Sequence, residues 1–223
     1  MDAPFPAVEA AGLTLRTRRG TVYDDATFSV PAGSLAMLVG PTGSGKTALL
    51  LTLAGRMKPT DGRMRSFGED ALRNAGAVRS RTALGLVAGV NDLSDTLSVR
   101  DHVREALVLG GQAATPARIA SALQPVGLET DLSAQAGSLT AIEKELLGVA
   151  LALTSHPRVL IVDDADHDLT PDEQVRLMDV LRFIAESGVT VIAACVDPRL
   201  AANADVILAL RLHGTKEDTD EVA

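Results

Sequence analysis

The feature that most constrains the fold of this chain is a glycine-rich segment at residues 40–47, which matches the phosphate-loop pattern G-x-x-x-x-G-K-[ST] in full. A short apolar run, 34–39, precedes it, and a run of strong helix formers, 48–54, follows it. This order predicts a buried strand, a phosphate-binding turn and the first turns of a helix. The alternative interpretation is an ordinary glycine-rich turn between a strand and a helix.

Each part of this segment has a chemical role in holding a nucleotide. Glycines let backbone N–H groups curl around phosphate oxygens, and the N-terminus of the following helix adds a partial positive charge. Lys46, which is also a candidate catalytic residue, is expected to reach the β- and γ-phosphates, and the Thr47 hydroxyl to ligate Mg²⁺. The residues predicted to bind the nucleotide are Gly40, Pro41, Thr42, Gly43, Ser44, Gly45, Lys46, Thr47 and Ala48.

A second candidate site follows the apolar run 159–162, which ends at Asp163 and Asp164. A carboxylate at the C-terminal end of a buried parallel strand lies beside the phosphate loop in folds of this class. Asp163 is therefore predicted to hold Mg²⁺ together with Thr47. The alternative role for Asp163 is to cap the next helix.

Periodicity along the 223 residues indicates an α/β architecture. Alternation over 7–30 predicts antiparallel strands near the N-terminus, and Ser98 with Asp101 marks the start of a helix. Helical patterns separate the later strands, which indicates a mostly parallel sheet. The later strand signals lie at 84–87, 159–162, 189–194 and 206–210. Helical signals lie at 112–155, 171–187 and 198–204, and the first of these has breaks at 125–127 and 136–138. With four Phe, one Tyr and no Trp, the core must be aliphatic.

Composition excludes several functional classes. The net charge is −8 and no basic run is present, which argues against a nucleic-acid partner. The one cysteine, Cys195, excludes an internal disulfide and suits a reducing cytosol. The N-terminus lacks the features of a signal peptide, and no apolar stretch has the ~20 residues of a membrane span. A role at a membrane would therefore need a partner, and the acidic segment 214–223 is expected to be disordered.

Further segments resemble the nucleotide-binding subunit of ATP-binding cassette (ABC) transporters, and the resemblance runs from about 11 to 212. The matching segments, in the family's order, are 22–33, 50–62, 97–103, 156–164 and 203–207. The resemblance implies a phosphate-loop NTPase core with a mostly parallel central sheet, an N-terminal antiparallel β-subdomain and an inserted helical subdomain at about 90–155. Together these would form a single ATP-binding cassette domain over 1–223.

The motifs that this family uses for hydrolysis differ in this sequence. A glutamate serves the family as general base, and Asp164, which is one methylene shorter, stands in its place. The family's signature motif corresponds to 139–143, where an alanine and Ile142 replace two glycines. Gly89 stands at the Q-loop glutamine and Val196 at the switch histidine.

Two other positions leave alternatives open. His167 lies in the acidic run 163–168 and could replace the missing switch histidine, or be a solvated loop residue. Where the family stacks an aromatic residue on adenine, this sequence has Arg18 and Arg19, which could stack on a base or simply face solvent.

The resemblance implies a subunit that binds ATP with Mg²⁺ and dimerises through its nucleotide face, as a homodimer or a heterodimer. It would drive a separately encoded integral membrane permease from the cytoplasmic face of the cell membrane. The altered motifs imply a weak ATPase, with Asp164 as a poor general base. The alternative is an ATP-sensing module that binds without hydrolysis. A phosphate-loop kinase is a third possibility, but the late arginines, Arg182, Arg199 and Arg211, form no lid-like cluster.

Overall fold

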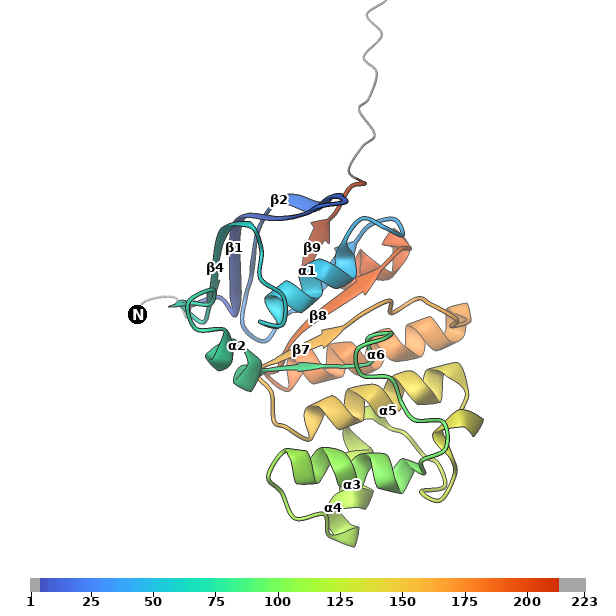
Figure 1. Cartoon of the computed structure of the whole chain (residues 1–223). Helices are drawn as coiled ribbons and strands as arrows, with labels where there is room; N and C mark the ends of the chain where they lie inside the picture. Colours follow the sequence, from blue (N-terminus) through green and yellow to red (C-terminus); the bar gives the residue numbers. More distant parts are fainter. Residues whose placement is uncertain (1–4, 213–223) are drawn as a thin grey trace, which may run out of the picture.

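The computed structural model describes residues 5–212, which form two sheets with helices between and below them (Figure 1). The antiparallel sheet has the order β2-β1-β4-β5, and the parallel sheet has the order β6-β7-β8-β3-β9. The strands are β1 (Val8–Thr17), β2 (Gly20–Val30), β3 (Leu35–Val39), β4 (Asp61–Ser66), β5 (Glu69–Asp70), β6 (Thr82–Leu84), β7 (Val159–Val162), β8 (Thr190–Cys195) and β9 (Val206–Ala209). The predicted fold class is confirmed.

The helices are divided between the two faces of the parallel sheet. α1 lies between the two sheets, α5 and α6 cover the opposite face, and α3 and α4 pack outside α5 (Figure 1). The α-helices are α1 (Lys46–Leu53), α2 (Ala75–Arg81), α3 (Val99–Leu109), α4 (Pro116–Ala122), α5 (Ala141–Leu153) and α6 (Pro171–Glu186). Short 3₁₀ turns occur at η1 (Gln124–Val126), η2 (Ala136–Ser138) and η3 (Pro198–Asn203).

Two aliphatic clusters form the core, one on each face of the parallel sheet. The first lies between the antiparallel sheet, α1 and one face of the parallel sheet, and includes Leu38, Leu49 and the buried Tyr23. The second joins the sheet to α3–α6 and includes Leu146 and Leu177. Because both faces are covered, β7 and β8 are buried at every position, as their continuous apolar sequences predict.

The structure differs from the sequence-based prediction in the region 61–87. β4, β5 and α2 were not predicted, because this stretch is rich in arginine and glycine and lacks a clear hydrophobic period. The strand predicted at 84–87 is wrong in its bounds, since β6 covers Thr82–Leu84 and thus begins two residues earlier and ends three residues earlier. Its start is fixed by parallel pairing with β7, which is a contact between distant segments.

The helical region shows one confirmed start and one error. Ser98 caps α3 as predicted, because its hydroxyl accepts the Asp101 N–H at 3.1 Å. The long helical stretch predicted over 112–155 is wrong in its middle, where residues 128–135 form a loop. Within 5–212 no helix combines the length and the apolar character needed to cross a membrane. The acidic segment 214–223 lies outside the described residues.

Candidate nucleotide-binding site

Three loops meet at the C-terminal edge of the parallel sheet. The phosphate loop follows β3, Asp163 follows β7 and Val196 follows β8, and β8 lies between the other two strands. Because parallel strands end at the same edge, segments far apart in sequence surround one cavity. This cavity has a volume of about 760 Å³. Its lining residues are Val22, Thr42, Gly43, Gly45, Lys46, Thr47, Ala48, Asp164, Asp166, His167, Asp168 and Val196.

Two glycines allow the phosphate loop to take its shape. Gly45 has φ +91°, and a Cβ there would lie 2.4 Å from the carbonyl oxygen of Val22 on β2. Gly40 is equally confined, since its Cβ would lie 2.7 Å from the Leu210 carbonyl oxygen. The pattern therefore selects glycine where the backbone must turn and where neighbouring strands approach closely.

The side chain of Lys46 lies across the phosphate loop and is held by its first residues. The residue is only 5% exposed, and its ammonium donates to the carbonyl oxygens of Gly40 at 2.8 Å and Pro41 at 3.2 Å. The cation thus lies over the turn whose backbone N–H groups would surround a phosphate.

Thr47 and Asp163, the two residues predicted to hold Mg²⁺, are in direct contact. The Thr47 hydroxyl donates to the Asp163 carboxylate at 2.6 Å, and the Asp164 N–H donates to its other oxygen at 3.1 Å. Asp163 is only 6% exposed, and this burial raises the pKa of its carboxyl above the ordinary value.

This pair has the chemistry of a Mg²⁺ site. A hydroxyl and a carboxylate are hard oxygen ligands, and a divalent cation would offset the cost of the buried charge on Asp163. Among residues 5–212 no group of three or more His, Cys, Asp or Glu side chains has metal-binding geometry. That is compatible with Mg²⁺, which usually takes one or two carboxylates and completes its shell with phosphates and water.

Asp164 faces the cavity from the turn after β7. It is exposed, lines the cavity and adopts φ +44°, a left-handed conformation that non-glycine residues rarely take. Such conformations are concentrated at functional sites, where the surrounding structure maintains them. Its assignment as a weak general base stays a prediction.

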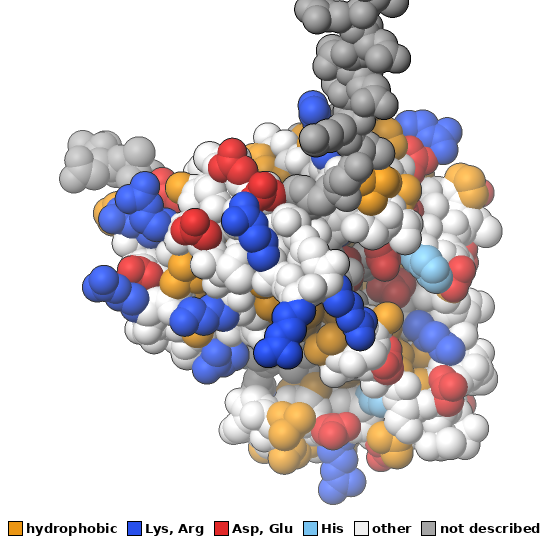
Figure 2. Space-filling model, turned by 45° about the horizontal axis from the view of Figure 1, so that its top comes forward, with side chains coloured by type: hydrophobic (Ala, Val, Ile, Leu, Met, Phe, Trp, Pro, Cys, Tyr) orange, Lys and Arg blue, Asp and Glu red, His pale blue; other side chains and the backbone are white. Residues whose placement is uncertain are grey.

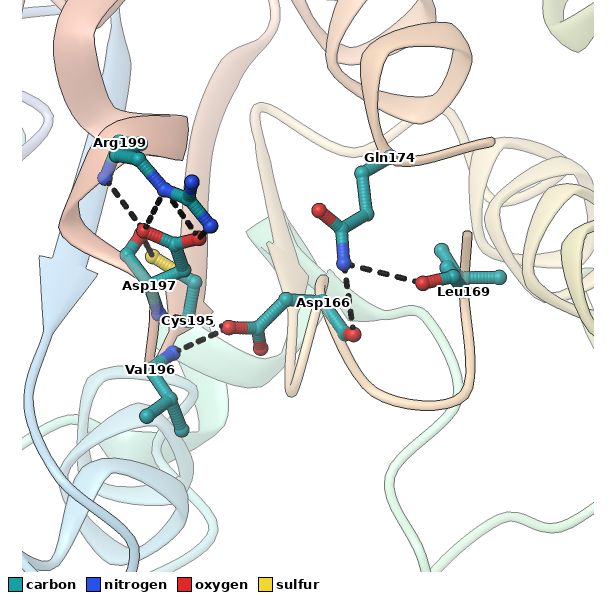
Figure 3. A network of polar contacts seen from close by, with 7 residues as sticks. All are labelled: Asp166, Leu169, Gln174, Cys195, Val196, Asp197 and Arg199. Carbon is teal, nitrogen blue, oxygen red and sulfur yellow. Dashed lines mark hydrogen bonds and ion pairs between the residues drawn. The ribbon is translucent and has the colours of Figure 1, made fainter. Parts of the chain in front are cut away.

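The loop after β8 is tied to the loop after β7 by Asp166, a residue that the sequence reasoning did not single out (Figure 3). One carboxylate oxygen of Asp166 accepts the N–H groups of Val196 and Asp197, both at 2.8 Å. The Gln174 amide donates to the carbonyl oxygens of Asp166 and Leu169, both at 3.1 Å. The short side chain of aspartate often accepts hydrogen bonds from nearby backbone N–H groups in turns. No sequence signal, however, indicates that Asp166 accepts them from a loop that is distant in sequence.

The segment corresponding to the signature motif forms a well-capped helix start. Thr140 caps α5 and exchanges hydrogen bonds with Glu143 in a capping box. Ile142 is only 4% exposed, so its side chain packs into the aliphatic cluster under α5. The bulky side chain that replaces a glycine of the motif is therefore directed into the core and away from solvent.

The segment corresponding to the Q-loop uses its polar groups internally. Gly89 has φ +73° and donates its N–H to Asp92 at 2.9 Å. The Asn91 side chain accepts the Val87 N–H at 2.9 Å and donates to the Gly85 carbonyl at 2.8 Å. The only side-chain amide of this turn is thus committed to the turn itself.

Glu145 on α5 is a half-buried acid that the sequence reasoning missed. Its Oε2 is buried and makes no hydrogen bond to any residue between 5 and 212. Burial, with repulsion from Asp164 and Asp163, raises its pKa to about 7. A glutamate at a helix start carries no sequence signal of burial, because the direction of its side chain depends on how α5 packs.

A comparison with known families identifies this architecture. The family model described as ABC transporter matches residues 23–167, which include the phosphate loop and Asp163. This chain belongs to the ABC transporter family. The solved dimeric structure of MJ0796, a bacterial ABC transporter cassette, superposes with a TM-score of 0.78 at 19% identity over 92% of this chain and 94% of that one.

Relatives within the ABC family include ATP-binding proteins of several transport systems. The methionine import ATP-binding protein MetN 2 of Paraburkholderia xenovorans is 30% identical over 82% of this chain. The lipoprotein-releasing system ATP-binding protein LolD of Chromohalobacter salexigens is 32% identical over 95% of this chain and 93% of its own length. The chain spans about half the length of the methionine import relatives that it matches, 53% for MetN 2.

Proposed function

We propose that this chain is the ATP-binding subunit of an ABC-type transporter or related membrane complex, and that it binds Mg·ATP and hydrolyses it slowly. The observation that carries the proposal is the contact between Thr47 and Asp163 beside the phosphate loop. It brings together a hydroxyl and a carboxylate from segments that are distant in sequence, next to a buried lysine.

In this proposal the phosphate-loop residues hold the triphosphate. Backbone N–H groups of 42–47 would surround the β- and γ-phosphates, and Lys46, which donates to the Gly40 carbonyl, would donate to the phosphate oxygens instead. Thr47 and Asp163 hold Mg²⁺, which would neutralise charge on the phosphates. Asp164 lies on the opposite wall of the cavity, where it would orient water and accept its proton.

Nucleotide binding is tested by titrating the protein with a fluorescent ATP analogue in the presence of Mg²⁺. We expect saturable binding that Lys46→Ala weakens by two orders of magnitude, because the lysine contributes charge-assisted hydrogen bonds. A matched control is Lys58→Ala, which removes a lysine beyond α1 that does not line the cavity. Absence of binding to the wild-type protein, or binding unaffected by Lys46→Ala, would contradict the proposal.

Hydrolysis is tested by measuring phosphate release. General bases contribute typically 10²–10⁴-fold, so an enzyme of ordinary turnover, about 10 per second, would fall to about 10⁻³–10⁻¹ per second with a misplaced base. We expect a rate in that range and an increase of at least tenfold in Asp164→Glu, which extends the carboxylate by one methylene. A wild-type rate near 10 per second that is abolished by Lys46→Ala would rule out slow hydrolysis.

The remaining parts of the proposal concern assembly. The relatives named above are ATP-binding proteins of import and release systems, and the MJ0796 cassette is dimeric. We propose that this chain likewise dimerises through its nucleotide face, as a homodimer or a heterodimer, and binds a separately encoded permease at the cytoplasmic face of the membrane. Crosslinking in cells followed by membrane fractionation tests this, and recovery of the chain with soluble partners only would argue against it.

A further inference from the structure

The wall of the cavity that faces the phosphate loop is poor in hydrogen-bond donors. It carries the carboxylates of Asp164, Asp166 and Asp168, which accept hydrogen bonds and repel anions. The oxygens of a terminal phosphate are also acceptors. A triphosphate that fills this cavity therefore needs a donor on this wall to offset the surrounding negative charge.

The loop after β8 does not supply that donor. The Val196 side chain reaches the cavity and is 43% exposed, but it has no polar atom. The N–H groups of Val196 and Asp197 are already donated to Asp166 at 2.8 Å (Figure 3). The Val196 side chain thus has no group that could donate to a phosphate oxygen. The two backbone N–H groups could do so only if Asp166 released them.

His167 is the one side chain among the cavity-lining residues of this wall that can donate a hydrogen bond. Its Nδ1 lies 3.2 Å from an oxygen of Asp168, and its side chain is 69% exposed. The other ring nitrogen, Nε2, makes no hydrogen bond to a described residue, and it donates when both ring nitrogens carry a proton. Acidic side chains of the kind that surround the cavity are spread over the face drawn in Figure 2, and some of them lie beside a histidine.

The backbone around His167 is held firmly at this place. The Ala165 N–H donates to the Ala194 carbonyl at 2.8 Å, and the His167 N–H donates to the Asp164 carbonyl at 2.9 Å. Gln174 fixes the carbonyl oxygens on either side of the turn, as described above. The imidazole therefore projects from a fixed turn, so that a contact with a ligand costs little conformational entropy.

We propose that His167 donates a hydrogen bond to the terminal phosphate of bound ATP and thereby makes the site distinguish ATP from ADP. This inference rests on the proposed nucleotide site and assigns to the turn after β7 a contact that Val196, after β8, cannot make. Asp168 acts as a positioning residue, because it holds the ring through Nδ1 and directs Nε2 away from itself.

The test compares ATP and ADP dissociation constants, in the presence of Mg²⁺, for the wild-type protein, His167→Leu and His167→Gln. A hydrogen bond to a charged group predicts that His167→Leu weakens ATP binding by about tenfold or more and leaves ADP binding unchanged. His167→Gln keeps a donor and should recover part of the ATP preference. The matched control is His156→Gln, an exposed histidine that does not line this cavity, which should change neither constant.

The outcomes separate this inference from the proposed function. Equal weakening of ATP and ADP by His167→Leu, or an ATP constant within twofold of wild type, would overturn the role of His167 while nucleotide binding itself stands. Wild-type protein that binds neither nucleotide would overturn both. A circular dichroism spectrum of each variant identifies a loss of folding, in which case the His167→Gln result decides.

Discussion

The contact between Thr47 and Asp163 joins the first turn of α1 to the end of β7. At 2.6 Å, this is a short O–H···O hydrogen bond in which the hydroxyl donates to the carboxylate. The Asp163 carboxyl is buried, and desolvation is the largest influence on its raised pKa. A bound cation would reverse that cost, so the chemistry of this pair depends on whether a metal is present.

Replacement of Asp163 by asparagine should separate metal-dependent from metal-independent binding. Asp163→Asn keeps the shape of the side chain but removes the charge that holds Mg²⁺. We expect the dissociation constant for ATP in Mg²⁺ to rise by about 10- to 100-fold, as for other lost contacts to a charged group. In excess EDTA the wild-type and variant constants should be equal, and a difference that persists in EDTA would contradict the metal role.

Glu145 should make the stability of the protein fall as pH rises. The folded-state pKa is about 7, above the ordinary value of 4.5, so the folded state binds the proton more tightly than the unfolded state. The penalty is absent below about pH 4.5, grows as pH rises to 7, and above pH 7 reaches about 3 kcal/mol, because each unit of pKa shift corresponds to about 1.4 kcal/mol. We expect Glu145→Gln to be more stable than wild type at pH 8 and nearly equal at pH 5, as measured by urea denaturation. A difference that is the same at both pH values would show that Glu145 is not buried as described.

At the scale of elements, predictability depended on whether a signal was local. Ser98 and Asp101 form a capping motif within four residues, and α3 begins where they predict. The phosphate loop is likewise contiguous, and β3 and α1 flank it as expected. β4 and β6 end or begin where another strand pairs with them, which no single window of sequence specifies. Tertiary context therefore decided the boundaries that propensity could not.

α5 packs so closely on the segment after β6 that it has room only for glycine at one position. A Cβ at Gly148 would lie 2.4 Å from Leu86 Cγ and 3.1 Å from the Leu86 N atom. We expect Gly148→Ala to lower the free energy of unfolding by about 1–3 kcal/mol, the usual cost of overpacking. Gly76 on α2 is the matched control, since the nearest atom to its Cβ would be 3.9 Å away. Gly76→Ala should raise the free energy of unfolding by about 0.5–1 kcal/mol, because alanine has the higher helix propensity. Denaturant titration of the two variants measures whether the changes in free energy have opposite signs.

At the scale of the whole molecule, the candidate nucleotide site lies where the two aliphatic clusters meet the edge of the parallel sheet. β3, β7 and β8 contribute residues to both clusters and carry the three loops of the site. α1, whose N-terminus completes the phosphate loop, lies between the two sheets (Figure 1). A ligand at this place contacts segments from both halves of the core.

Mg·ATP should therefore stabilise the molecule as one unit. Binding to the folded state alone adds about 2.7 kcal/mol at a ligand concentration 100 times the dissociation constant. We expect one unfolding transition, shifted upward in midpoint by Mg·ATP, in a thermal scan that follows far-ultraviolet circular dichroism. Lys46→Ala should remove the shift. Two transitions, with only one of them shifted, would mean that the halves of the core unfold independently.

The phosphate-loop motif, the buried strand that ends at Asp163 and the α/β class were predictable from the sequence alone, because they depend on contiguous motifs and hydrophobic period. The sequence also indicated which motifs depart from the family pattern, such as Val196. Tertiary packing was needed to show that Asp166 holds the loop after β8, that Ile142 points into the core and that one carboxylate oxygen of Glu145 is buried. These features arise from the packing of distant segments, and the direction in which a side chain points is fixed by that packing and not by its neighbours in sequence.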